Sequence, residues 1–167
     1  MRDLDGAPYG GARFPVESVV DGRTFVKFHV DIGAGDVLIA PFETLRARNW
    51  LAFAGIVAPR FQAISPEQHF AEKLHAYTLP RTKPNTRVRD LVDMALLIGS
   101  GKLDAGLVAQ ALELTFTRRK THPVPAALKP PSAAWKEPFA VLAQECGLPA
   151  EVDAAFAVLD AFFAGLP

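Results

Sequence analysis

The first part of the chain shows the alternating pattern of β-strands. Residues 13–20 and 23–32 are rich in β-branched and aromatic side chains, and Asp21-Gly22 separates them. Because Asp-Gly readily adopts the positive φ angles of a type I′ turn, we predict a β-hairpin. One face of its second strand is predicted to face the core, and it carries Thr24, Val26, Phe28, Val30 and Ile32. The opposite face carries Phe25, Lys27, His29 and Asp31. Weaker strands are predicted over residues 37–42 and 56–64.

The pattern changes to helical spacing at Ser65-Pro66. A serine before a proline, with Gln68 at the capping-box position, predicts the start of a helix. Apolar residues then recur at helical spacing up to the C-terminus, except over residues 121–134, where four prolines predict an extended strap. Helices are predicted over about residues 66–79, 87–98, 103–118, 138–146 and 151–164.

These elements predict an α+β fold, in which an antiparallel β piece precedes a helical half. We divide the chain into a β-rich part (residues 1–65), a helical part (66–120) and a part with the proline-rich strap and the last helices (121–167). The length of 167 residues fits one domain. Half the residues are apolar, which argues against a disordered chain.

Charge and cysteine content limit the expected partners and compartment. The chain has 18 basic and 18 acidic residues, so no overall positive field predicts a nucleic-acid or membrane-surface partner. Basic residues outnumber acidic ones within residues 66–120, so an anionic partner would bind there. The single cysteine, Cys146, is predicted to be a buried helix residue. A single cysteine cannot form a disulfide within the chain, and we find no signal-peptide or membrane-span pattern. Both observations favour a reducing cytoplasm.

A lysine and two aspartates on the first two predicted helices form the most informative pattern. Lys73 lies on one helix, and Asp90 and Asp93 lie three residues apart on one face of the next. These residues form either a structural ion pair between packed helices, which the pattern alone favours, or a phosphate-binding lysine with acidic neighbours. The cations of this part form two groups, Arg81, Lys83, Arg87 and Arg89, and Arg118, Arg119 and Lys120. We interpret the second group as a solvated helix end.

Other candidate chemistry is less specific. Asp31 ends a predicted strand before a glycine-rich loop, where it either binds a metal ion or caps the loop. Asp3-Leu-Asp5 has the spacing of an acidic pair, but no strand precedes it and we interpret it as a frayed terminus. The sequence has no zinc-ligand spacing, no dinucleotide-binding or P-loop glycine motif and no hydrolase nucleophile motif.

Segments from most of the chain carry a resemblance to a known family. They read FPVES, FHVDIGAGD, PEQHFAEKLHAYTLPR, NTRVRDLVDMALLI and TFTRRKTHPVPAALKPPSAAW. Together they resemble the AbiEii/AbiGii toxin-like nucleotidyltransferases of abortive-infection and toxin–antitoxin systems. The resemblance implies a fold like that of DNA polymerase β-type nucleotidyltransferases. It also implies transfer of a nucleotide from an NTP to an acceptor, RNA such as tRNA, with an antitoxin protein as partner and without sequence-specific DNA binding.

The resemblance also implies roles for the candidate residues and favours the functional interpretation of Lys73. The implied roles are phosphate binding for Lys73, orientation of that lysine or acid–base work for Asp90, support for Asp93, contacts to NTP or RNA phosphates for Arg87 and Arg89, and binding of Mg²⁺ for Asp31.

The family also uses a Gly-Gly-Ser/Thr turn and an Asp-x-Asp pair on an early strand, and we find neither in that context before Arg13. We therefore expect the chain to be the C-terminal piece of a longer protein, or a family member without the metal-binding half. Such a member would act as a protein- or RNA-binding module. A third possibility is a folding fragment with an exposed apolar surface and an unpaired sheet edge.

Overall fold

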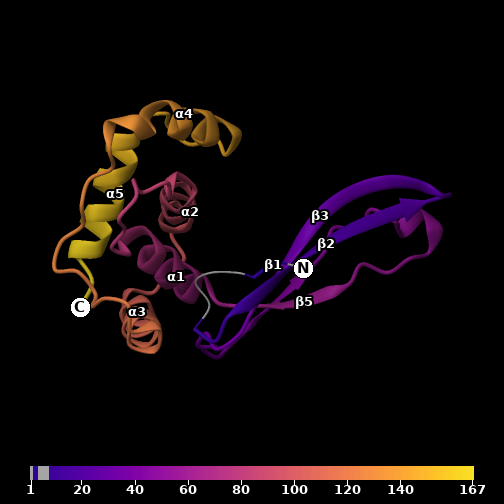
Figure 1. Cartoon of the computed structure of the whole chain (residues 1–167), viewed down its shortest axis with the longest axis horizontal. Coiled ribbons are helices and arrows are strands. Elements are labelled where there is room, and N and C mark those ends of the chain that lie inside the picture. Colours follow the sequence, from indigo (N-terminus) through magenta and orange to yellow (C-terminus); the bar gives the residue numbers. More distant parts are fainter. Residues whose placement is uncertain (1, 4–7) are drawn as a thin grey trace.

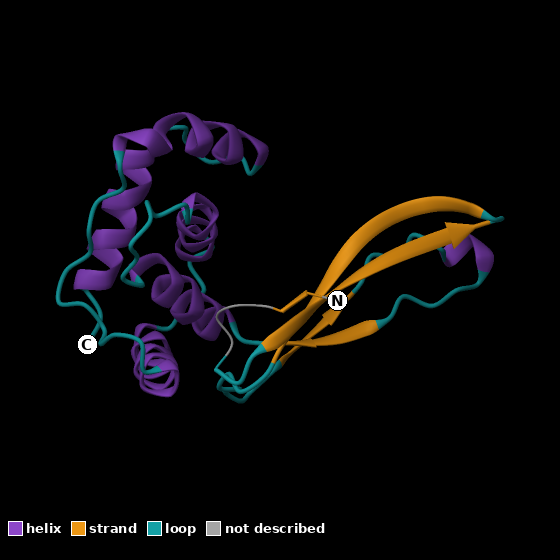
Figure 2. Cartoon of the chain, in the orientation of Figure 1, coloured by secondary structure: helices purple, strands orange, loops and turns teal. Residues whose placement is uncertain are grey.

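The computed structural model describes residues 2–3 and 8–167 and shows a group of helices from which the β-strands extend (Figure 1). Strands β1 (Arg2–Asp3), β2 (Gly11–Val20) and β3 (Arg23–Gly33) form an antiparallel sheet in the order β1-β2-β3. Strands β4 (Glu43–Arg46) and β5 (Arg60–Ala63) form a second antiparallel pair, with the short helix η1 (Ala52–Ala54) between them. The remaining elements are helical (Figure 2), which confirms the predicted α+β class.

The predicted hairpin is confirmed as β2 and β3. Asp21 and Gly22 have φ angles of 49° and 71°, as a type I′ turn requires of its two central residues. The register pairs Arg13 with Asp31 and Val16 with Phe28 and has an irregularity after Ser18. The turn residues therefore fix which side chains share a face of the sheet.

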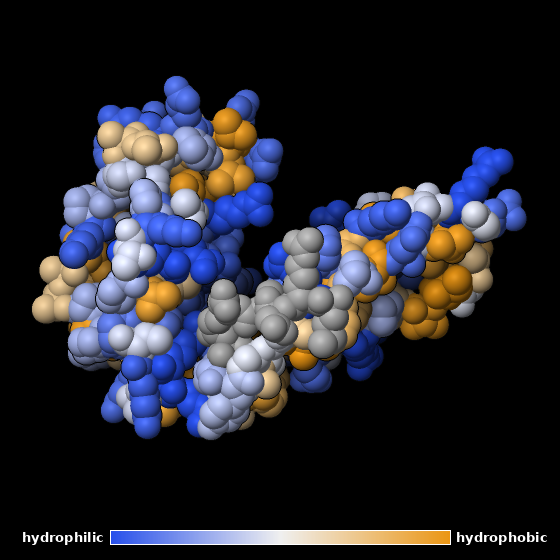
Figure 3. Space-filling model, viewed as in Figure 1, coloured by the Kyte–Doolittle hydropathy of each residue, from blue (hydrophilic) through white to orange (hydrophobic). Residues whose placement is uncertain are grey.

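The predicted core face of β3 is exposed, so this prediction is wrong. All eleven residues of β3 are exposed, including Phe28 at 46% and Val30 at 40%. In Figure 3 hydrophobic residues accordingly gather on the surface of the hairpin. Alternation showed correctly which residues share a face, but burial also needs a second layer. Among the described residues no helix packs on this sheet.

The strand predicted over residues 37–42 is also wrong, since this segment is a loop and the strand follows it. Pro41 has no N–H group to donate to a ladder. The side chain of Gln68 supplies the hydrogen bonds instead, because it accepts from Ile39 N at 3.0 Å and donates to Val37 O. Of the segment predicted over residues 56–64, the second half forms β5.

The predicted helices are confirmed with small shifts of their ends. Ser65 caps α1 by accepting a hydrogen bond from Gln68 N at 3.1 Å, and Pro66 is the first helical residue. The side chain of Gln68 instead binds the loop described above. The helices are α1 (Pro66–Thr78), α2 (Val88–Gly99), α3 (Ala105–Arg119), η2 (Ala133–Trp135), α4 (Lys136–Glu145) and α5 (Val152–Ala164).

The hydrophobic core lies in the helical half. Its buried members come from all five α-helices, η2 and the strap. Helix α1 is its central element, because it packs against both α2 and α3. The residues with no exposed surface include Phe70, Leu74, Leu91, Met94, Phe139 and Leu159. Helices α1 and α2, which carry Lys73 and the aspartates, are therefore held together by buried apolar contacts.

Two predictions about single residues need correction. Cys146 is exposed, because it follows the last residue of α4, where the helix ends. Asp3 lies in β1 and pairs with Ala12 of β2, so the backbone at this position is not frayed. Asp5 lies outside the described residues.

Candidate functional site

The structure brings Lys73, Asp90 and Asp93 together between α1 and α2. Lys73 Nζ lies 2.6 Å from Asp93 Oδ2 and 3.3 Å from Asp90 Oδ1. The two aspartates are one helical turn apart, so both carboxylates face the lysine across the helix pair. The predicted constellation thus forms one ion-pair cluster.

The cluster lies at the boundary between core and solvent. The side chain of Lys73 is 26% exposed, and Asp90 is 5% exposed. Burial alone would lower the pKa of Lys73, but the hydrogen bond to Asp93 and the charge of Asp90 outweigh burial and raise this pKa above its usual value. Lys73 therefore remains a cation with part of its surface open to a ligand.

Asp90 differs from Asp93 in its surroundings. Its Oδ2 atom is buried and has no hydrogen-bond partner among the described residues. Arg87 forms a longer ion pair with this oxygen, with NH1 at 3.7 Å. Because an unpartnered buried carboxylate oxygen is costly, the charge of Asp90 depends on its ion pairs with Lys73 and Arg87.

Asn85 fixes the segment that leads from α1 into α2. Its side chain donates to Tyr77 O at 2.9 Å and accepts from Arg87 N at 3.0 Å. The backbone carbonyl oxygen of Asn85 accepts a hydrogen bond from Trp135 Nε1 at 2.9 Å. Sequence reasoning missed Asn85, which stood out only by its place in a polar loop, because the packed helices determine its partners.

A groove of about 910 Å³ opens beside the cluster. Its charged lining consists of Lys73, Arg81, Arg87, Arg89, Asp90 and Asp93. The side chains of Arg87 and Arg89 are exposed, so both predicted phosphate contacts lie on the groove. Four cations against two carboxylates favour an anionic ligand here.

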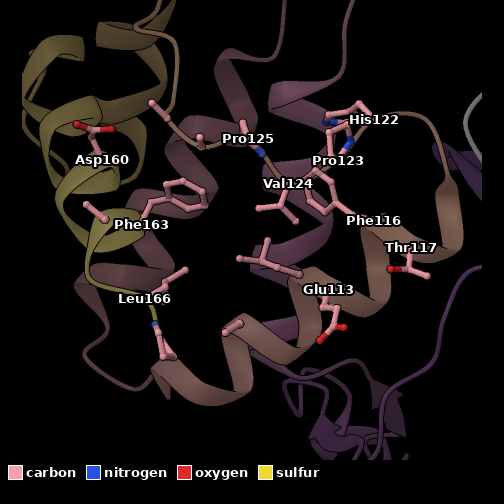
Figure 4. Close-up of a pocket in the computed structure, with 16 residues that line it drawn as sticks. Glu113, Phe116, Thr117, His122, Pro123, Val124, Pro125, Asp160, Phe163 and Leu166 are labelled. Atoms are coloured by element: carbon pink, nitrogen blue, oxygen red, sulfur yellow. The ribbon is translucent and has the colours of Figure 1, made fainter.

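Another groove, of about 720 Å³, lies between α3, the strap and α5 (Figure 4). Phe116, Val124, Phe163 and Leu166 give it a mainly apolar wall. Its carboxylates are Glu113 and Asp160, and none of its described lining residues is Lys or Arg. Of the two grooves, the one beside Lys73 is therefore the better fit for a phosphate.

Asp31 is not joined to this cluster by any ion pair or hydrogen bond among the described residues. Arg13 holds its carboxylate through two contacts, Nε to Oδ1 at 2.7 Å and NH2 to Oδ2 at 2.6 Å. The hydrogen bonds from Arg13 hold the pKa of Asp31 below its usual value. Across residues 2–3 and 8–167, no group of three His, Cys, Asp or Glu side chains is placed to hold a metal ion. These residues alone do not form the magnesium site that the resemblance implies.

The basic run at the end of α3 is more than a solvated helix end. Arg119 forms an ion pair with Asp36 at 2.8 Å, and Arg118 donates to Gly35 O at 2.6 Å. The guanidinium of Arg118 also stacks over the ring of Tyr9. These contacts attach the loop after β3 to the helical half. A pattern within one helix could not show them, because the partners lie 83 residues apart.

Comparison with known families agrees with the fold and with the resemblance. The family whose model matches this chain has a nucleotidyltransferase-like fold, and the α+β arrangement of the chain agrees with it. Residues 2–158 match the family described as nucleotidyl transferase AbiEii toxin of type IV toxin–antitoxin systems, and the chain belongs to this family. A comparison with curated proteins gives no match. No helix in the described part of the chain is long and apolar enough to cross a membrane.

Proposed function

We propose that the groove beside Lys73 binds the phosphates of an NTP and that this chain thereby serves nucleotidyl transfer. The observation that carries the proposal is the position of Lys73 Nζ, 2.6 Å from Asp93 and 3.3 Å from Asp90, on a groove with three further cations. A lysine fixed by two carboxylates keeps its charge and its direction. A phosphate-binding lysine needs this charge and this fixed direction, because it has to hold the phosphate in one geometry.

In the proposed reaction the acceptor's hydroxyl oxygen bonds to the α-phosphorus, and the bond to the departing pyrophosphate breaks. Such a transfer needs mainly positioning and neutralisation of charge. Lys73 offsets charge on the phosphates, and Arg87 and Arg89 contact the NTP or the acceptor's phosphates. Asp90 orients Lys73, and its carboxylate is the candidate acceptor for the hydroxyl proton. Asp93 keeps Lys73 in place.

The acceptor and the partner extend this proposal. We propose RNA such as tRNA as the acceptor, because the exposed arginines suit a phosphate backbone. An antitoxin protein is the proposed partner, since the family belongs to toxin–antitoxin systems. Reactions of this class generally use a divalent cation with the triphosphate. Asp31 remains the proposed Mg²⁺ ligand, which requires that Arg13 release it. A toxin that uses NTP and RNA would work in the cytoplasm.

Thermal unfolding with and without ligand tests the binding step. We would add each NTP with Mg²⁺ to the wild type and to Lys73→Met, with Lys102→Met as the control for loss of an exposed lysine. A ligand at a hundred times its Kd stabilises a protein by about 2.7 kcal/mol. We expect this shift in the wild type and the control and its loss in Lys73→Met. An equal NTP shift in all three proteins would refute the role of Lys73.

A binding module is the second candidate function. Two observations favour it. Asp31, the proposed metal ligand, is already held in an ion pair with Arg13, and the apolar face of β3 is exposed. No NTP shift in the wild type, together with tight binding of the antitoxin, would support the module. Transfer of a labelled nucleotide to RNA by the wild type, lost in Lys73→Met, would support the enzyme.

A further inference from the structure

Strand β3 forms a long unpaired edge of the sheet. It is the last strand in the order β1-β2-β3 and runs over 11 residues. In the described part of the chain, no segment is hydrogen-bonded to the outer side of β3. All its residues are exposed, and Figure 1 shows β3 along the upper border of the hairpin. A free edge of this length is a template for another strand.

The register shows which residues of β3 direct their backbone groups outward. In an antiparallel pair, opposite residues alternate between pairs that exchange hydrogen bonds and pairs that do not. Pro15 lies opposite His29 and has no N–H to exchange. Farther along, Ala34 N donates to Gly10 O, which places the even-numbered positions toward β2. The N–H and C=O groups of Lys27, His29 and Asp31 therefore face the free edge.

The charged side chains of the hairpin are ordered along this edge. Within the chain, Asp31 is paired with Arg13 at 2.6 Å and Lys27 with Glu17 at 3.6 Å. Lys27 and Asp31 lie symmetrically about His29, two residues to either side. Around His29 the edge therefore presents one positive and one negative charge at equal distances, as a surface that pairs with itself requires; Arg23 lies farther along the strand.

We propose that two copies of this chain pair through their β3 edges, antiparallel, with the two-fold axis at His29. In this register Lys27 of each copy lies opposite Asp31 of the other. Across the four strands of the two hairpins, the row then reads Arg13, Asp31, Lys27 and Glu17, with alternating sign. Opposite charges on neighbouring strands stabilise a sheet, and the same row occurs twice by symmetry.

Other registers fit less well. An axis at Phe28 would place Lys27 opposite His29 and Asp31 opposite Phe25, without an attractive pair. An axis at Lys27 would place Asp31 opposite Arg23, but it would also place the two lysines opposite each other at the centre, which is destabilising. With the axis at His29, the apolar face also continues across the junction, because Phe28 neighbours Val30 of the second copy. Both side chains are now partly exposed.

Sedimentation equilibrium over a concentration series tests the pairing. We expect a dimer whose dissociation constant rises at least tenfold in Lys27→Asp, since both attractive pairs become repulsive. Lys102→Asp, an exposed change outside the sheet, is the matched control and should leave the constant unchanged. A wild-type chain that stays monomeric throughout would overturn the proposal. So would a dimer that Lys27→Asp does not weaken, as expected if the apolar faces pack instead.

Cross-linking tests the register separately, in a Cys146→Ser background. Hydrogen-bonded opposite residues have Cα atoms about 5.5 Å apart, within the range of a disulfide. We therefore expect His29→Cys to form a covalent dimer under mild oxidation. Phe25→Cys is the control, because its two copies would lie eight residues apart along the strands, about 26 Å. Equal cross-linking of both variants, or of Phe25→Cys alone, would overturn this register. Circular dichroism checks that each variant is folded.

Discussion

His75 is predicted to make the helical half sensitive to acid. It lies on α1 at 3% exposure, with Nε2 at 2.8 Å from Thr121 Oγ1. Its ring packs edge-on against Phe116 at 4.8 Å between centroids. Burial, and then the charges of Arg119 and His122, lower the pKa of His75 from 6.5 to about 4. The folded state therefore holds this imidazole neutral.

The loss of stability follows from the difference in proton binding. Between pH 6.5 and about 4 the unfolded chain binds the proton and the folded chain does not, so the free energy of unfolding falls as pH falls. Each unit of pKa difference corresponds to about 1.36 kcal/mol. For His75 the loss reaches about 3 kcal/mol at pH 4. The burial of His122, whose pKa is also lowered, acts in the same direction.

Urea unfolding followed by circular dichroism at 222 nm measures this effect in the helices. We would compare the wild type with His75→Gln between pH 7 and pH 4, with His69→Gln on the same helix as the control for loss of a histidine. The wild type and the control should lose about 3 kcal/mol more than His75→Gln over this range. Equal losses in all three proteins would refute the reasoning.

Three further predictions concern the Lys73 cluster, the contact between α1 and the loop after β3, and the hydrophobic core. Lys73→Met should lower the free energy of unfolding by about 1–3 kcal/mol in urea at neutral pH, because buried Asp90 loses its nearest cation. The raised pKa of Lys73 means that its contribution persists below pH 10.5 and disappears above the folded pKa. An unchanged urea midpoint in Lys73→Met would contradict the predicted loss of stability. Gln68→Ala should cost about 1–3 kcal/mol and speed hydrogen exchange of the Ile39 amide, and an unchanged exchange rate would contradict this prediction. Phe139→Ala should cost about 3–5 kcal/mol in urea, and a loss below 1 kcal/mol would show that Phe139 is not part of a packed core.

Local signals were sufficient to predict most of the elements. Asp21-Gly22 defined the hairpin turn, and Ser65-Pro66 defined the start of α1, because each signal acts within a few residues. The Lys73 cluster could also be proposed, since amphipathic helices joined by a short loop tend to pack side by side. Its chemistry could not be chosen from spacing, because a structural ion pair has the same pattern.

Contacts between distant segments could not be predicted. Gln68 matched a capping box, but the structure uses its side chain for a loop some thirty residues earlier in the chain. Arg119 matched a solvated helix end, but it pairs with Asp36. The exposure of β3 has a similar cause. Alternation defines a face, but only the tertiary arrangement decides whether that face is covered.

Helix α1 links the two ends of the candidate site. Lys73 lies on its side toward α2, while Gln68 binds the loop that follows β3. Asp31 lies near the end of β3, and Arg119 holds Asp36 five residues later. The contacts of Gln68 and Arg119 with the loop after β3 therefore set the position of Asp31 relative to Lys73, because no core lies beneath the sheet in the described part of the chain. A change at Gln68 should disturb the end of β3 while leaving the Lys73 cluster intact, because buried contacts between α1 and α2 hold that cluster independently.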